Sequence, residues 1–344
     1  MPVLRKHYAD FDELLKVLHR EKTERPVLFE IFFDKEYYEF FADRSFAGIR
    51  HNSLEELELV VQAFYNAGYV YASIYGSEFG FPRQAQEHLK SISLNEGSVI
   101  HDWDSFNSYQ WMDPDRCDYS KLQAIEGKLP DNMKIVVMGP GGVLENVMAL
   151  VGYDNMCYML YENPELLQAV FDRVGSSTLR YYEKSLQYPS VGAIISNDDW
   201  GFNTQTFLST EDLRKYVFPW HKKIAEAAHR AGKPAILHSC GNMNKVFDDI
   251  IDDMKYDGKH SYEDNIFSVE KSIEKWGGRI AILGGLDLNF FINACLDEVK
   301  KRAKKLADIG VNKGGYALGS GNSLCYYIPR EKALAMIDIA INYS

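Results

Sequence analysis

Short runs of apolar residues alternate along this chain with longer segments in which apolar residues recur every three or four positions. A short apolar run is typical of a buried strand, and the longer period is typical of a helix that covers it. The strand pattern occurs at residues 27–33, 69–75, 133–138, 192–196, 234–238, 256–260, 279–284 and 314–318. Eight such runs separated by helical segments predict an α/β fold, a (β/α)8 TIM barrel.

The predicted helices begin and end at residues suited to those places. Ser53 followed by Glu56 matches a capping box, Gly68 ends the same helical segment, and Asn163 with Pro164 marks another helix start. A doubly wound open sheet is the alternative topology. It usually carries a glycine-rich phosphate-binding turn after the first strand, and none follows Phe33, so the closed barrel is preferred.

Residues 1–344 are expected to form one domain, since this length suits a single barrel with one insertion. The insertion is predicted at residues 76–132, between the second and third strands, where the chain departs from the regular spacing. It holds Trp103 and Trp111. Long connections after barrel strands are usually lids or partner-binding elements, and we expect that role here.

Charge and composition exclude several classes of function. The net charge of -11 opposes nucleic-acid binding. The N-terminal residues lack a signal-peptide pattern and no apolar run reaches the length of a membrane span, so a cytoplasmic protein is expected. Five cysteines at irregular spacing do not suit a disulfide framework, which leaves metal binding or catalysis as roles to test.

Candidate active-site residues are those that directly follow a strand, because barrel enzymes place their chemistry at the carboxyl ends of the strands. Asp198 and Asp199 follow the fourth strand and are candidates for orienting substrate or for proton transfer. The alternative to a catalytic role for both residues is helix capping and hydrogen bonding within the loop. Substrate contacts are expected from Glu30, Asp34, Tyr75, Asn197, Trp200, His260, Asp287 and Asn322.

His238 and Cys240 stand two residues apart at the end of the fifth strand, a spacing that lets both side chains reach one metal ion. Cys325, after the eighth strand, is the candidate third ligand. Each residue alone is more often an ordinary buried side chain. Together they favour a catalytic zinc ion with one open coordination position.

From Asn197 onward the chain resembles the uroporphyrinogen decarboxylase superfamily, and in particular its zinc methyltransferase branch. That branch includes methylcobalamin:coenzyme M methyltransferases and O-demethylase methyltransferases. The likeness covers at least the C-terminal half and is carried by residues 197–201 (Asn-Asp-Asp-Trp-Gly), 209–219, 238–241 (His-Ser-Cys-Gly), 284–287 (Gly-Gly-Leu-Asp) and 314–329.

The chain departs from the family pattern in two places. True decarboxylases carry an arginine-rich segment after the first strand that pairs with substrate carboxylates, whereas residues 33–38 here read Phe-Asp-Lys-Glu-Tyr-Tyr. Porphyrinogen decarboxylation is therefore disfavoured. The family register also places the usual third cysteine ligand nearer Asn322 than Cys325, so Glu30 or Asp199 remains an alternative third ligand.

The resemblance implies a zinc-dependent methyltransferase that moves a methyl group between a small methylated substrate and the cobalt of cob(I)alamin or methylcobalamin. An aromatic methyl ether is the preferred substrate, because the loops after the first two strands are aromatic. The chain has no D-x-H-x-x-G cobalamin-binding motif, so the corrinoid is expected on a partner protein. A metal-free decarboxylase-like lyase, a methylcobalamin:thiol methyltransferase, a non-enzymatic ligand-binding barrel and a homodimer remain open.

Overall fold

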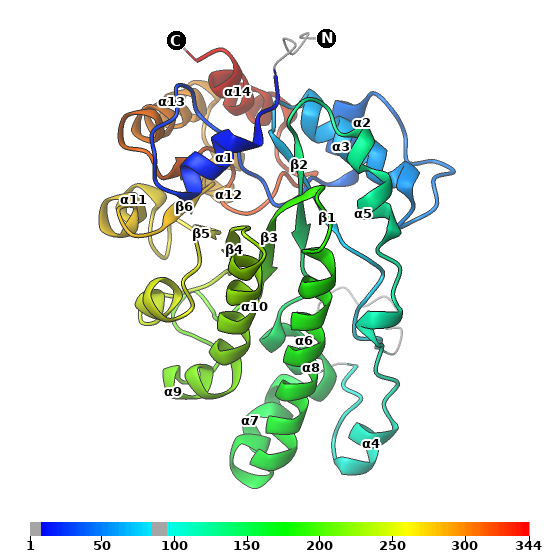
Figure 1. Ribbon diagram of the computed structural model, residues 1–344. Coiled ribbons are helices and arrows are strands. Elements are labelled where there is room, and N and C mark those ends of the chain that lie inside the picture. Colours follow the sequence, from blue (N-terminus) through cyan, green and yellow to red (C-terminus); the bar gives the residue numbers. More distant parts are fainter. Residues whose placement is uncertain (1–7, 84–94, 96, 344) are drawn as a thin grey trace.

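The computed structural model describes residues 8–83, 95 and 97–343. Within them, seven parallel strands form one curved sheet in chain order (Figure 1). The strands are β1 (Tyr71–Tyr75), β2 (Lys134–Met138), β3 (Val191–Asn197), β4 (Ala235–His238), β5 (Gly258–His260), β6 (Ala281–Leu283) and β7 (Tyr316–Ala317). Because all are parallel, their carboxyl ends lie along one rim.

The first predicted strand, residues 27–33, is not a regular strand, so the expectation of eight strands was wrong by one. This segment meets the chain after β7 through isolated bridges that join Leu28 to Leu318 and Phe33 to Leu324. On the other side it faces side chains of β1. The Tyr71 hydroxyl accepts the Glu30 N–H at 2.9 Å and donates to the Glu30 carbonyl at 2.6 Å.

The Tyr71 hydroxyl therefore bonds the Glu30 N–H and carbonyl that would otherwise pair with the backbone of β1. This explains why residues 27–33 do not form a regular strand. The segment still lies between β7 and β1. The predicted fold class is confirmed, because the molecule is an α/β barrel of the TIM type. Among the described residues it has seven regular strands, and the irregular segment at residues 27–33 takes the place of an eighth.

Helices alternate with the strands around the sheet (Figure 1). They are α1 (Phe11–Leu18), α2 (Lys35–Ala42), α3 (Leu54–Asn66), α6 (Val143–Val151), α7 (Tyr153–Glu162), α8 (Pro164–Ser185), α9 (Thr210–Asp212), α10 (Phe218–Arg230), α11 (Val269–Trp276), α12 (Leu288–Asn293), α13 (Leu296–Lys313) and α14 (Arg330–Ile341), with π-helical turns at Leu213–Val217 and Asp249–Asp253. Among the described residues, none of these helices combines the length and apolar character that a membrane span requires.

The helix starts follow the sequence signals with one difference. Asn163 caps α8, and the Ser53 hydroxyl accepts the Glu56 N–H at 3.2 Å at the start of α3. The predicted capping box is not closed, because the Glu56 carboxylate accepts hydrogen bonds from His51 Nδ1 and from the Asn52 N–H. The polar groups of this turn thus gather beside α3 rather than folding back onto Ser53.

Residues 76–132 connect β1 to β2 and hold α4 (Trp103–Ser108), α5 (Ser120–Ala124) and the 3-10 turns Pro114–Arg116 and Glu126–Lys128. Part of the segment, residues 84–94 and 96, lies outside the described residues. Its second half is tied to the barrel helices: Asp115 pairs with Arg180 of α8 at 2.8 Å, and Lys128 pairs with Glu58 of α3. A lid or docking role for the rest stays a prediction.

Replacing Tyr71 with phenylalanine tests whether its hydroxyl holds the backbone of residues 27–33 against β1. Tyr71→Phe should lower the free energy of unfolding by about 2 kcal/mol or more, since two buried backbone groups of Glu30 lose their partner at about 1–3 kcal/mol each. Tyr69→Phe is the matched control, because the buried Tyr69 hydroxyl has no partner among the described residues. Urea unfolding measures both variants, and equal effects would contradict this role for Tyr71.

Candidate metal centre

The strand register brings three predicted residues to one level of the rim. Asn197 at the end of β3 is the direct neighbour of His238 on β4, and His238 is the neighbour of His260 on β5. Side chains at paired positions of a parallel sheet point to the same face. Asp199 and Cys240 each follow two residues later, so they continue on that face beyond the strand ends.

Asp199, His238 and Cys240 form a compact donor set. One ligand atom from each lies within 4.8 Å of the other two. His238 Nε2 lies 3.6 Å from Cys240 Sγ, and Asp199 Oδ1 accepts the Cys240 N–H at 2.7 Å. The short backbone contact holds the carboxylate beside the thiol, so the three groups converge without rearrangement of the chain.

His260 fixes the orientation of His238. The two Nδ1 atoms share a hydrogen bond of 2.8 Å, which leaves Nε2 of His238 directed toward Cys240. Burial lowers the pKa of both imidazoles, and the nearby Lys259 ammonium lowers both further. Both rings are therefore neutral at neutral pH, the form in which histidine binds a metal ion.

Two polar side chains lie beside the Cys240 sulfur. Ser261 Oγ lies 3.4 Å from it, and the Asn322 amide donates to it at 3.4 Å. Ser261 is held in the left-handed region, at a φ of 92°, and its carbonyl accepts a hydrogen bond from the buried Lys259 ammonium. Non-glycine residues in this conformation are strained and gather at functional sites.

The donor set fits a zinc ion. Zinc takes imidazole nitrogen at about 2.0–2.1 Å and thiolate sulfur at about 2.3 Å, which at tetrahedral angles separates the two ligand atoms by about 3.5 Å. The observed separation of 3.6 Å between His238 Nε2 and Cys240 Sγ agrees with this value. Burial raises the pKa of Cys240, so the thiolate needs a nearby cation, and hydrogen bonds from Ser261 and Asn322 suit a charged sulfur.

Cys325, the expected third ligand, is not part of this donor set. The side chains that influence its pKa, after burial, are Tyr327, Asp34 and Glu30. Asp34 accepts the Tyr326 N–H at 2.7 Å and so anchors the loop that carries Cys325 to the segment after residue 33. The place beside Cys240 is taken by Asn322, as the family register indicates, and Asp199 supplies the third donor.

Asp198 and Trp200 do not face the centre. Asp198 is fully buried and accepts the N–H groups of Leu144 and Glu145 at the start of α6, at 2.9 and 3.0 Å, and His221 Nε2 at 2.9 Å. Trp200 is fully buried against Phe218, with ring centres 4.9 Å apart. In the structure Asp198 caps α6 and Trp200 packs in the core, and their predicted catalytic and substrate roles stay predictions.

The other residues predicted to contact substrate fall into two groups. Some are buried and bonded to the protein backbone, and others lie at the rim of the barrel. Glu30 is fully buried and accepts the N–H and hydroxyl of Ser320, both at 2.6 Å, and burial raises its pKa to about 8. Asp287 accepts the Phe290 and Asp264 N–H groups and caps α12. Tyr75 is half exposed at the end of β1, and Asn197 carries a buried amide oxygen without a partner among the described residues.

Glu145 is a residue that the sequence analysis missed. It lies in the first turn of α6, where its carboxylate accepts the Gly142 N–H at 2.8 Å. Burial, followed by the neighbouring Asp198 and Asp199 carboxylates, raises its pKa to about 8. The available signal was an acid three residues after the glycine turn that follows β2. Ser261 was missed as well, although it directly follows the predicted His260.

The family model for uroporphyrinogen decarboxylase matches residues 10–343 of this chain. The chain belongs to the uroporphyrinogen decarboxylase family. A uroporphyrinogen decarboxylase from Geobacter sulfurreducens is 23% identical over 184 residues, which cover 54% of this chain and 51% of that protein. The chain thus spans about half the length of the decarboxylases that it matches.

The similarity to methyltransferases extends over a larger share of this chain. The methylcobamide:CoM methyltransferase MtbA of Methanosarcina acetivorans is 21% identical over 264 residues, covering 75% of this chain and 68% of MtbA. A solved methyltransferase from Methanosarcina mazei has the same fold, with a TM-score of 0.67, 17% identity and coverage of 98% of this chain and 99% of that chain.

Asp198 and Asp199 are adjacent, and their substitution should separate a structural from a functional carboxylate. Asp198→Asn should lower the free energy of unfolding by about 3 kcal/mol or more, because it breaks a buried pair with His221 and weakens the α6 cap. Asp199→Asn should stay within about 1 kcal/mol of wild type, since the amide oxygen still accepts the Cys240 N–H. Thermal and urea unfolding measure both, and a stable Asp198→Asn would contradict its structural role.

Proposed function

We propose that this protein is a zinc-dependent methyltransferase that works with the cobalt of a separate corrinoid protein. The observation that carries the proposal is the convergence of Asp199, His238 and Cys240 at the barrel rim. Similarity to a corrinoid-linked methyltransferase over 75% of the chain supports it. Three protein ligands leave a coordination position for substrate, as in catalytic zinc sites.

The chain's own residues would hold and tune the ion. His238, Cys240 and Asp199 would be its ligands, and His260 would keep His238 in the tautomer that exposes Nε2. Ser261 and Asn322 would stabilise the Cys240 thiolate. When bound, zinc supplies Lewis acidity, which stabilises the charge that develops on the substrate oxygen or sulfur during methyl transfer.

We propose an aromatic methyl ether as the methyl donor. Phe32, Phe33 and Tyr75 follow or lie near the ends of the first two strand segments, and residues 27–42 contain no arginine that would pair with a polycarboxylate. These features disfavour porphyrinogen decarboxylation. Methylation of a thiol by methylcobalamin is the second candidate, because MtbA is named for that acceptor.

The corrinoid partner would approach the rim, where the proposed metal position opens to solvent. Asp199, Cys240 and Asn322 are all partly exposed there. A corrinoid is large and planar, so it requires access from outside the barrel rather than through the sheet.

Zinc content tests the ligand set. His238→Ala, Cys240→Ser and Asp199→Ala should each weaken zinc binding by more than the about 10–100-fold typical of losing a group that only supports a ligand. Cys325→Ser, the matched control, should keep wild-type affinity. X-ray absorption at the zinc edge should show one sulfur near about 2.3 Å. Two sulfur atoms would bring Cys325 back into the ligand set.

Turnover tests the reaction. Zinc-loaded protein, a reduced corrinoid protein and 2-methoxyphenol should produce methylcobalamin absorbance, and His238→Ala should abolish it while the barrel stays folded. A thiol acceptor with methylcobalamin serves as the comparison substrate. Transfer to the thiol alone would favour the second candidate, and stoichiometric zinc with neither activity would count against methyl transfer.

A further inference from the structure

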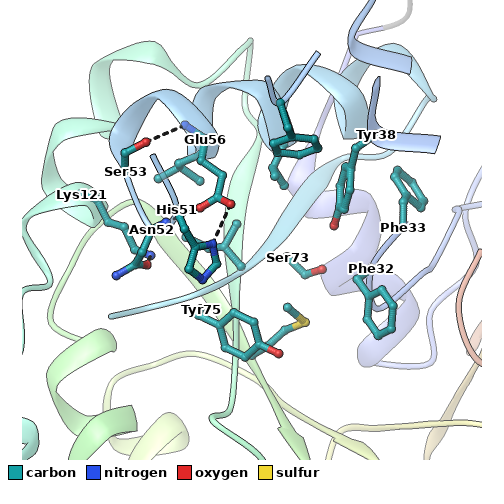
Figure 2. A pocket seen from close by; sticks show the side chains of 15 residues that line it. Phe32, Phe33, Tyr38, His51, Asn52, Ser53, Glu56, Ser73, Tyr75 and Lys121 are labelled. Atoms are coloured by element: carbon teal, nitrogen blue, oxygen red, sulfur yellow. Dashed lines mark hydrogen bonds and ion pairs between the residues drawn. The ribbon is translucent and has the colours of Figure 1, made fainter. Parts of the chain in front are cut away.

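A cavity of about 270 Å³ lies between the segment at residues 32–33, helices α2 and α3, and strand β1. Figure 2 shows its two unlike sides, with Tyr38, Phe33 and Phe32 on one and Lys121, Asn52, His51 and Glu56 on the other. Asp199, His238 and Cys240 do not line it. The cavity is therefore lined by residues other than those of the candidate metal centre.

The walls and volume of the cavity suit one aromatic ring. Phe32, Tyr38, Phe46 and Tyr75 present ring faces or edges to it, while Val60 and other aliphatic side chains complete the wall. Aromatic rings stack or meet edge to face favourably. An apolar cavity of about 150 Å³ holds benzene, so this larger space accepts a ring with small substituents.

The polar side presents hydrogen-bond donors. Both Glu56 oxygens are already occupied, Oε1 by His51 at 2.9 Å and Oε2 by the Asn52 N–H. Lys121 donates to the Asn52 side-chain oxygen, and an ammonium has three N–H groups. The cation is offset by the nearby Glu56 carboxylate, so this side favours a neutral or weakly acidic oxygen acceptor over a polyanion.

We propose that this cavity binds the ring of a small methoxylated or hydroxylated arene, with the ring among Phe32, Tyr38 and Tyr75 and one oxygen substituent at Lys121. This assigns the substrate-binding pocket of the proposed methyl transfer and rests on that function. Tyr75 links the two sites, because it lines the cavity and ends β1, on the rim of the parallel sheet that also carries the candidate metal centre.

Calorimetric titration with 2-methoxyphenol tests the pocket without using turnover. Wild-type protein should bind it with a Kd of about 1 mM or lower, a modest affinity for a ligand of this size. Lys121→Met should weaken binding about 10-fold by removing the donors while keeping an apolar stem. Lys128→Met is the matched control, since Lys128 follows in the same segment but pairs with Glu58 outside the cavity, and it should bind normally.

A second variant, Val60→Trp, should fill the cavity and abolish binding. Circular dichroism and thermal unfolding check that it folds; if it does not, Lys121→Met and the wild type decide alone. The His238→Ala variant should still bind the arene, because His238 does not line the cavity. Wild-type protein that binds the arene but transfers no methyl group would overturn the proposed function and leave the pocket standing. No binding by wild type, or equal binding by wild type and Lys121→Met, would overturn the pocket.

Discussion

The parallel register of β3, β4 and β5 is the constraint on which the candidate centre depends. It sets Asn197, His238 and His260 side by side at the rim, and two further residues of extended chain bring Asp199 and Cys240 onto the same face. A slip of one residue would turn each of these side chains to the opposite face. The closed barrel fixes the register, because every strand is hydrogen-bonded on both sides or covered by residues 27–33.

The same alternation explains why two adjacent aspartates have different surroundings. Asp199 points to the centre, whereas Asp198 and Trp200 point the other way, into the layer between β3, α6 and α10. A buried carboxylate without partners would be costly, and the α6 N–H groups and His221 satisfy Asp198. The structural carboxylate thus anchors the helix whose first turn carries Glu145 beside the centre.

The surroundings of Cys240 define the donor set of the candidate centre. The amide of Asn322 donates to the sulfur, and the Asp199 carboxylate and the His238 imidazole complete the donor set. The set therefore combines one thiol sulfur, one imidazole nitrogen and one carboxylate oxygen, which are ligand types that zinc accepts.

The sequence by itself determined the alternation of strands and helices, the gathering of polar candidate residues at the strand ends, and the pairing of His238 with Cys240, because each follows from local period or spacing. It did not determine the third donor, since Asp199 lies 39 residues before His238 and only the barrel register joins them. Residues 27–33 have a strand pattern, yet hydroxyls of a neighbouring strand take their backbone groups. The aromatic cavity, with Lys121 opposite Tyr38, likewise exists only where distant segments pack together.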